Sequence, residues 1–183
     1  VHEGREILDE SSVVGEDGTV QNVFVYVKEG LDAWKFPVPA EPVVIDQIGC
    51  IYVPHVAGMQ LGQKLKFRNS DPVLHNVHGQ PKRNPEFNFG QTKQGMETEV
   101  DIKRAEVMIP VKCDVHGWMQ TYVGVVKHPY FRVTGEGGAF ELSELPPGKF
   151  VIEAWHELYG TLSQEVEVGD KETKEIVFTF SRK

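Results

Sequence analysis

Three side chains with metal-binding chemistry lie close together in the second half of this 183-residue chain. Cys113, His116 and Met119 follow one another at intervals of three residues, so a thiolate, an imidazole and a thioether share one short segment. Runs typical of β-strands lead into this segment at Val107–Val111 and out of it at Thr121–Val126. We therefore predict one tight loop between two strands, with all three side chains directed at a single point.

A second imidazole is available upstream, where His75 follows a predicted strand and a turn. Two imidazoles, one thiolate and a weak axial thioether form the trigonal site of blue copper, in which soft sulfur favours Cu(I) and imidazole suits both oxidation states. His78 is the other candidate for the first imidazole, but we expect it on the opposite face of its strand, outside the ligand set. We predict that copper (Cu+/Cu2+) is bound by His75, Cys113, His116 and Met119.

The chain has only one other cysteine, Cys50, and three roles are open to it. A disulfide with Cys113 would leave His116 and Met119 without a purpose. A second thiolate beside Cys113 would make a two-thiolate copper centre, although known two-copper loops carry both cysteines on the ligand loop. The third role is a small buried hydrophobe beside the site. We predict that Cys50 is unbridged and lies close to the metal.

Trp118 is the residue between two predicted ligands, His116 and Met119, in the sequence. It is either a packing residue or an apolar rim around the edge of His116. An exposed ligand edge within an apolar patch allows electrons to pass to a partner. We therefore expect Trp118 to form this rim.

The elements that must position these residues are predicted to be β-strands throughout the chain. Short apolar runs alternate with turn signals such as Ala57-Gly58 and Gln94-Gly95, which is typical of a β-sandwich or barrel. We find no convincing amphipathic helix and expect a long polar loop over Gly79–Gly95. Five more strands are expected at Phe131–Thr134, Ala139–Leu142, Lys149–Trp155, Leu162–Val168 and Glu175–Phe180.

Residues from about Val43 to Lys127 resemble the cupredoxin family, in its plastocyanin and amicyanin branch. The resemblance rests on His75-Asn76-Val77, on the short Cys-x2-His-x2-Met loop, and on Tyr52-Val53-Pro54 followed by Gly62–Phe67. It implies an all-β, Greek-key sandwich that carries one copper ion, with the four ligands named above, and that moves single electrons.

The same resemblance implies further roles and marks two departures. It implies that Asn76 joins the cysteine loop to the histidine strand through hydrogen bonds, which tune the metal. It also implies that the strand carrying His55 passes near the copper. There His55 could hydrogen-bond to a ligand or bind a late metal, and a surface position is equally open to it. Val115 stands where the family often has proline, and Cys50 stands where it usually has an apolar residue.

Residues 129–183 resemble carboxypeptidase-regulatory-like, prealbumin-type Ig-like modules. The resemblance is carried by Val133–Leu142 (VTGEGGAFEL) and Leu145–Phe150 (LPPGKF). The first strand of such a module is expected well upstream, and Gly18–Val27 could supply it. We therefore expect a cupredoxin domain at 42–128, inserted into a smaller Ig-like β-sandwich made of 1–35 and 129–183.

The leading functional hypothesis is a one-electron carrier, or an electron-transfer subunit, that is not an enzyme by itself. A periplasmic copper-binding or trafficking protein is the alternative, and a copper enzyme would need an open coordination position or a second copper. The net charge of −8 would repel nucleic acid. A redox partner such as a c-type cytochrome or a dehydrogenase is expected, without a membrane span. We expect the chain to be periplasmic or secreted, with a signal peptide removed.

Overall fold

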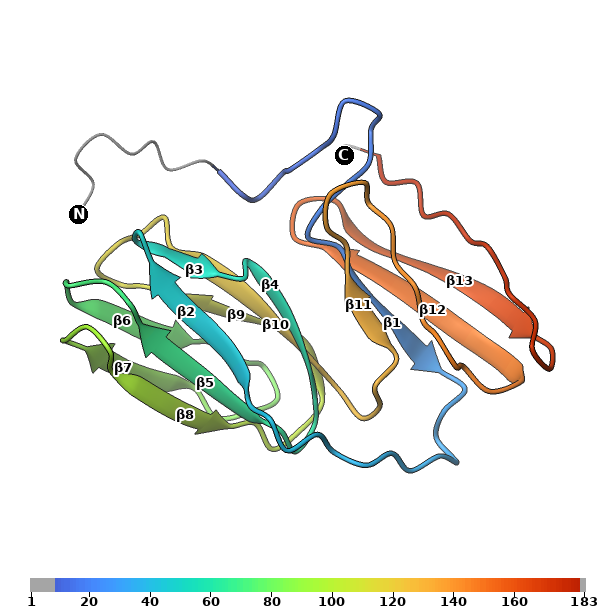
Figure 1. The fold of residues 1–183 in the computed structure, drawn as a ribbon, viewed down its shortest axis with the longest axis horizontal. Helices are drawn as coiled ribbons and strands as arrows, with labels where there is room; N and C mark the ends of the chain where they lie inside the picture. The colour runs from blue at the N-terminus through green and yellow to red at the C-terminus, as the bar shows by residue number, and fades with distance from the viewer. Residues whose placement is uncertain (1–8, 182–183) are drawn as a thin grey trace. The chain divides into compact units, whose positions relative to one another are not determined.

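The computed structural model describes residues 9–181, which divide into two compact units. The first unit is Pro37–Lys127, and the second combines Asp9–Phe36 with the residues from His128 onward. The described residues form strands, turns and irregular segments without any helix, and so none that could cross a membrane. The predicted all-β class is therefore confirmed, with three sheets distributed over the two units (Figure 1).

The first unit contains two sheets. The five-stranded sheet has the order β4-β10-β9-β6-β7, and the four-stranded sheet has the order β3-β2-β5-β8. Strand pairs β2/β5 and β4/β10 are parallel, and the other neighbours are antiparallel. The strands are β2 (Val43–Ile48), β3 (Ile51–Val53), β4 (Val56–Gln60), β5 (Lys64–Asn69), β6 (His75–Gly79), β7 (Phe87–Gln91), β8 (Glu97–Asp101), β9 (Glu106–Lys112) and β10 (Gln120–Val126).

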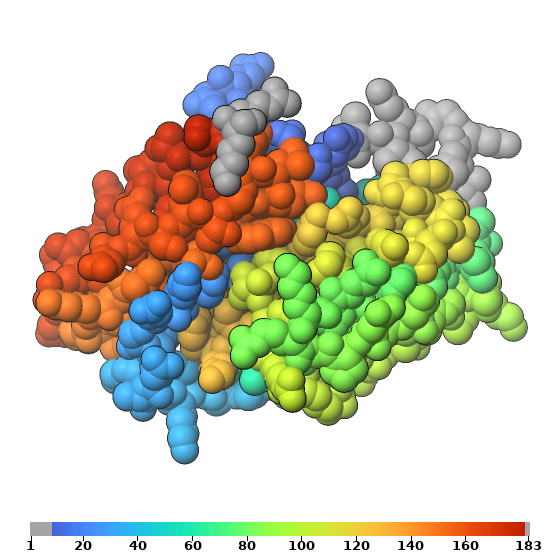
Figure 2. Space-filling view, turned by 180° about the vertical axis from the view of Figure 1, so that it is seen from behind, coloured from blue at the N-terminus to red at the C-terminus, as the bar shows by residue number. Residues whose placement is uncertain are grey.

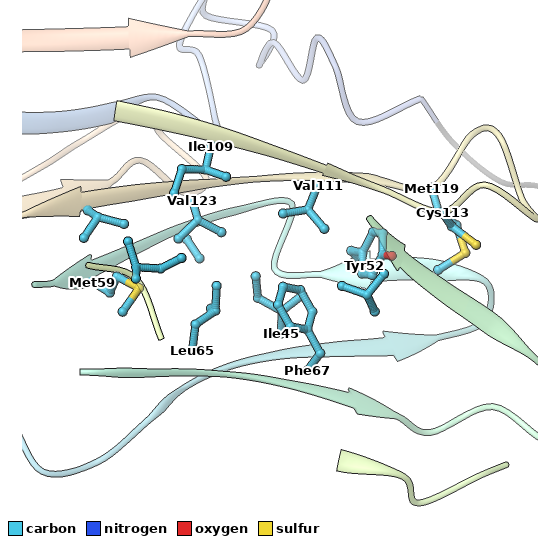
Figure 3. Close-up of a cluster of buried hydrophobic side chains, with 14 of the residues drawn as sticks. Ile45, Tyr52, Met59, Leu65, Phe67, Ile109, Val111, Cys113, Met119 and Val123 are labelled. Carbon is cyan, nitrogen blue, oxygen red and sulfur yellow. The ribbon is translucent and has the colours of Figure 1, made fainter. Parts of the chain in front are cut away.

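The core of this unit lies between its two sheets. In Figure 3, side chains from both sheets point toward one another, among them Leu65 and Phe67 from β5, and Ile109 and Val123 from β9 and β10. These side chains are fully buried. Alternation of apolar and polar residues along the strands produces this arrangement, because successive side chains of a strand point to opposite faces.

Strand β5 shows how the pattern fixes the pairing of strands. Leu65 and Phe67 are buried, whereas Lys64 and Lys66 project outward and form ion pairs with Asp101 and Glu97 of β8. A shift of one residue would move the apolar side chains to solvent, so burial sets the register and the exposed ion pairs add little free energy. This register brings the end of β5 to the candidate metal centre.

The second unit is built around strand β1 (Phe24–Glu29). This strand lies between β11 (Phe131–Val133) and β12 (Gly148–His156), and β13 (Gly160–Val168) completes an antiparallel sheet of order β11-β1-β12-β13. N-terminal and C-terminal parts of the chain thus share one sheet, and Figure 2 shows their blue and orange atoms in contact. The Ig-like assignment and the predicted domain limits stay predictions.

Three local predictions were wrong. Segments 139–142 and 175–180 form no strands, although alternate residues, among them Phe140 and Phe178, pack against the core of the second unit. The alternating pattern agrees with the packing of these side chains, but it cannot show whether a partner backbone lies alongside. Gly79–Gly95 is not one long loop, because it contains strand β7 (Phe87–Gln91), which pairs with β6.

Candidate metal centre

Three segments of the first unit meet at the candidate centre. They are the turn between β2 and β3, the turn that precedes β6, and the loop between β9 and β10. His75 is the first residue of β6, and Cys113–Met119 forms the β9–β10 loop, as the strand-like runs on both sides predicted. Cys50 is the second residue of the β2–β3 turn.

The β9–β10 loop is closed by its own backbone. The N–H of Cys113 donates to the carbonyl oxygen of Met119 over 3.2 Å, and the N–H of Met119 donates to the carbonyl oxygen of His116 over 2.9 Å. Cys113 and Met119 are almost fully buried and lie together at one end of the core in Figure 3, whereas His116 is half-buried. The loop therefore turns both sulfur side chains inward and leaves the imidazole nearer the surface.

Nitrogen and sulfur donors from two segments converge. The Nδ1 atom of His75 lies 3.1 Å from the Nδ1 atom of His116, and the Sγ atom of Cys113 lies 3.8 Å from the same His116 nitrogen. The ring centroids of the two histidines are 4.9 Å apart. Two imidazoles and a thiol thus lie close together, and the assignment of these three residues as metal ligands stays a prediction.

The Cys113 sulfur accepts hydrogen bonds that favour its thiolate form. Backbone N–H groups of Asn76 and His116 each donate to Sγ over 3.4 Å. Burial alone would raise the pKa of the Cys113 thiol, but hydrogen bonding with His75 and with these N–H groups outweighs burial and lowers the pKa. Asn76 also accepts a hydrogen bond at Oδ1 from the N–H of Asp114 over 3.1 Å, which ties the cysteine loop to β6.

Cys50 is a free, fully buried cysteine close to the two histidines. Its Sγ atom, one ring nitrogen of His75 and one ring nitrogen of His116 all lie within 4.8 Å of one another. Burial, followed by the charge of Asp71, raises the pKa of the Cys50 thiol. The pKa values of the two thiols are therefore shifted in opposite directions, because two backbone N–H groups donate to the sulfur of Cys113 and stabilise its thiolate form.

The turn that carries Cys50 has an unusual backbone. Gly49 and Cys50 both have positive φ angles, 67° and 57°, in the two-residue connection between β2 and β3. Such hairpin turns require positive φ at both central residues, and a non-glycine residue there carries a cost of about 1–2 kcal/mol. Contacts outside the turn must therefore stabilise this conformation.

Asp71 supplies those contacts, and sequence reasoning missed it. Its Oδ1 accepts a hydrogen bond from the N–H of Gly49 over 2.7 Å, and its Oδ2 accepts one from the N–H of Cys50 over 2.8 Å. The Nε2 atom of His75 lies 2.8 Å from the same Oδ2. Burial would raise the pKa of Asp71, but the hydrogen bonds from Cys50, Gly49 and His75 outweigh it and hold the pKa below its ordinary value.

The side chain of Asn69 positions Asp71. The Oδ1 atom of Asn69 accepts a hydrogen bond from the N–H of Asp71 over 2.9 Å, and its Nδ2 donates to the carbonyl oxygen of Val73 over 2.8 Å. Asn and Asp side chains commonly shape turns in this way. A carboxylate four residues before a candidate ligand, in Asp71-Pro72-Val73-Leu74-His75, was the sequence signal that could have found it.

Trp118 lies beside the exposed edge of the site. Half of its surface is accessible (51%), and its ring centroid is 5.3 Å from that of His116. Its indole N–H donates to the carbonyl oxygen of Cys50 over 2.9 Å. The side chain expected to form a rim therefore contacts His116 and anchors the Cys50 turn.

The remaining two histidines considered from the sequence have other surroundings. His78 Nδ1 lies 2.8 Å from an oxygen of Asp114, and its Nε2 lies 2.6 Å from an oxygen of Glu86. Both of its ring nitrogens thus have carboxylate partners. His55 is buried with its ring centroid 5.9 Å from that of Tyr122. Neither belongs to the Cys50, His75 and His116 group.

Comparison with known proteins gives matches in fold only. No model of a protein family and no curated protein matches the chain. A mutant of amicyanin in its oxidized state matches 46% of this chain and 81% of its own, with 20% identity and a TM-score of 0.41. A purple cupredoxin from Nitrosopumilus maritimus matches 45% of this chain and 97% of its own, with 19% identity and a TM-score of 0.39.

A copper-containing nitrite reductase from Thermus scotoductus is also similar in structure. The match covers 51% of this chain but 25% of the reductase, with 18% identity and a TM-score of 0.43. The chain therefore spans about a quarter of the length of that enzyme. At these identities the likeness concerns the fold alone.

Proposed function

We propose that the first unit is a cupredoxin domain with a mononuclear, type 1-like copper centre, and that the protein transfers single electrons. His75, Cys113 and His116 would be the three strong ligands, and Met119 would be the weak axial ligand. The observation that carries this proposal is the convergence of His75 Nδ1, His116 Nδ1 and Cys113 Sγ on one point.

The spacing of the donor atoms fits one metal ion. Metal–nitrogen and metal–sulfur bonds of about 2.0 and 2.3 Å, at tetrahedral or trigonal angles, separate neighbouring ligand atoms by about 3.3–3.8 Å. The nitrogen pair at 3.1 Å and the nitrogen–sulfur pair at 3.8 Å lie close to these separations. The mixture of imidazole with soft sulfur suits copper.

A bound copper would supply one-electron cycling between Cu(I) and Cu(II). The protein's own residues would hold one geometry through both states. The Cys113 sulfur is held by the N–H groups of Asn76 and His116, and His75 is held by Asp71. Such a rigid donor set keeps reorganisation small, which is the physical requirement for fast electron transfer.

The exposed residues around His116 suit contact with a redox partner. Val115 and Trp118 are each 51% exposed, and Leu74 is 42% exposed. A partner docking on this apolar surface would come close to the half-buried imidazole. We propose a c-type cytochrome or a dehydrogenase as partner, in the periplasm or outside the cell. The net charge of −8 favours a partner with a basic face.

A two-thiolate centre is the second candidate, and the position of Cys50 favours it. Because the sulfur of Cys50 lies within 4.8 Å of ring nitrogens of His75 and His116, a small movement would bring it to the metal.

Copper trafficking has less support, because the buried Cys113, His75 and Met119 side chains are poorly placed for exchange. We propose that the protein is not an enzyme by itself, since four protein ligands would leave no open coordination position.

The proposal is tested by copper loading of three full-length proteins: wild type, Cys113→Ser and Cys50→Ser. The mononuclear centre predicts one Cu(II) per chain and an intense thiolate-to-copper band in the visible region. This band should vanish in Cys113→Ser and persist in Cys50→Ser. Loss of the band in both variants would support the two-thiolate centre instead. Binding of Cu(II) by wild type without such a band would refute both candidates.

A further inference from the structure

Asp71 is a buried carboxylate that contacts a candidate ligand, His75, without belonging to the proposed ligand set. It is 5% exposed, and its two oxygens have three partners: the N–H groups of Gly49 and Cys50, and Nε2 of His75. Burial of an unpaired carboxylate would be strongly unfavourable. The three partners offset that cost and leave the carboxylate fixed between two segments of the site.

The contact with Asp71 determines which nitrogen of His75 carries a proton. Oδ2 of an ionised carboxylate can only accept, so Nε2 at 2.8 Å must donate. In the neutral ring the other nitrogen, Nδ1, then has a free lone pair. Nδ1 is the atom that lies 3.1 Å from His116 Nδ1 and faces the candidate metal position.

The same carboxylate also holds the β2–β3 turn that carries Cys50. Gly49 and Cys50 have left-handed backbone conformations, and both N–H groups point at Asp71. One side chain therefore positions the nitrogen donor of His75 and the thiol of Cys50 together.

We propose that Asp71 is a positioning residue of the metal centre, which fixes the Nε2–H tautomer of His75 and places a negative charge behind this ligand. The tautomer is a property of the metal-free protein. The effect on the metal rests on the proposed function: a carboxylate that accepts from a ligating imidazole makes it a stronger donor. Extra negative charge near copper favours Cu(II) over Cu(I) and so lowers the reduction potential.

The first experiment uses the metal-free, full-length protein. Long-range ¹H–¹⁵N correlation spectra of the histidine rings, recorded at a pH high enough for the His75 ring to be neutral, should show His75 protonated at Nε2 and unprotonated at Nδ1. Asp71→Asn is nearly isosteric, but it removes the negative charge that favours donation by Nε2–H and leaves one acceptor oxygen for the three partners. The Nε2–H population of His75 should therefore fall in this variant. Asp101→Asn is the control, since Asp101 is an exposed carboxylate that pairs with Lys64 at the opposite end of β5.

The second experiment measures metal affinity and reduction potential. Asp71→Asn should bind Zn²⁺ about 10–100-fold more weakly than wild type, as is typical when the partner of a ligating histidine is removed. Its copper form should have a higher reduction potential. Asp101→Asn makes the same change of charge and should match wild type in both measurements.

The outcomes separate this inference from the proposed function. If wild type shows no thiolate-to-copper band, the proposed function fails, and the tautomer measurement still decides the role of Asp71. If the band is present but Asp71→Asn keeps the affinity, potential and tautomer of wild type, the inference is wrong. Should Asp71→Asn fail to fold, an Nδ1–H tautomer in wild type would by itself overturn the inference.

Discussion

His78 Nδ1 lies 2.8 Å from the Oδ2 atom of Asp114, the residue that follows the thiol Cys113. Its other ring nitrogen lies 2.6 Å from Oε1 of Glu86, in the segment between β6 and β7. The imidazole thus connects β6 to two neighbouring segments. The hydrogen bond to Glu86 has the largest effect and raises the pKa of His78 above its ordinary value. Burial acts second and opposes the rise, and the hydrogen bond to Asp114 adds to it.

This pair of contacts predicts a pH dependence of stability. Because the pKa of His78 is higher in the folded protein, its contribution is fully present below the unfolded value of about 6.5 and is lost as pH rises through the folded pKa. The free energy of unfolding of wild type should therefore fall more between pH 6 and pH 9 than that of His78→Gln. Each of these exposed ion pairs is expected to contribute about 0.2–1 kcal/mol.

Urea unfolding of both metal-free proteins at a series of pH values measures this difference. The comparison isolates His78, because the raised pKa of His75 and the lowered pKa of Cys113 are shared by the two proteins. Glu86→Gln provides a second check, since it should lower the pKa of His78 in an NMR titration. Parallel stability curves for wild type and His78→Gln would contradict the prediction.

As the weak axial ligand, Met119 is predicted to affect the reduction potential of the copper more than the affinity of its binding. Met119→Leu conserves volume at a nearly fully buried position, so the unfolding free energy should change by less than about 1.5 kcal/mol. Loss of the thioether removes a weak donor that helps to stabilise Cu(II), and the reduction potential should rise.

Visible spectroscopy and voltammetry of the copper-loaded Met119→Leu variant test this expectation. The thiolate-to-copper band should remain, since its source is Cys113. Met59→Leu is a matched control, because Met59 is a fully buried methionine of the same core that lies on β4, away from the β9–β10 loop. An unchanged potential in Met119→Leu would show that this sulfur is a packing group only.

The β9–β10 loop could be predicted from sequence because its information is local. Cys113, His116 and Met119 lie within seven consecutive residues, and the β-branched runs beside them identify β9 and β10. Donors this close in sequence must lie close in space. The position of His75 could not be predicted from local sequence alone, because its approach to His116 depends on the pairing of β6 with β9.

Asp71 and Cys50 could not be paired from sequence by the same reasoning. Twenty residues separate them, and their contact depends on the left-handed turn at Gly49 and Cys50. Glycine, asparagine and aspartate are typical of left-handed turn positions, whereas cysteine is not. Strand β7 was missed for a related reason: the polar residues around Phe87–Gln91 resemble a loop, and only the pairing with β6 makes the segment a strand.

Strand β1 offers a test of whether the two units fold independently. Val25 is 1% exposed within the core of the second unit, and β1 pairs with β11 and β12. Val25→Asp would bury an unpaired carboxylate and should cost about 4 kcal/mol or more. We expect the second unit to unfold while the copper site of the first unit persists.

Three measurements on full-length Val25→Asp test the independence of the units. Binding of an apolar dye should increase, and the urea transition of the second unit should be lost. The thiolate-to-copper band should keep the intensity of wild type, because the donors His75, Cys113 and His116 all belong to the first unit. Val177→Asp is the matched control: it makes the same substitution in the second unit at a side chain that is 77% exposed, and stability should change by no more than about 0.5 kcal/mol. Loss of the band in Val25→Asp, with Val177→Asp unchanged, would mean that the first unit needs the second in order to fold.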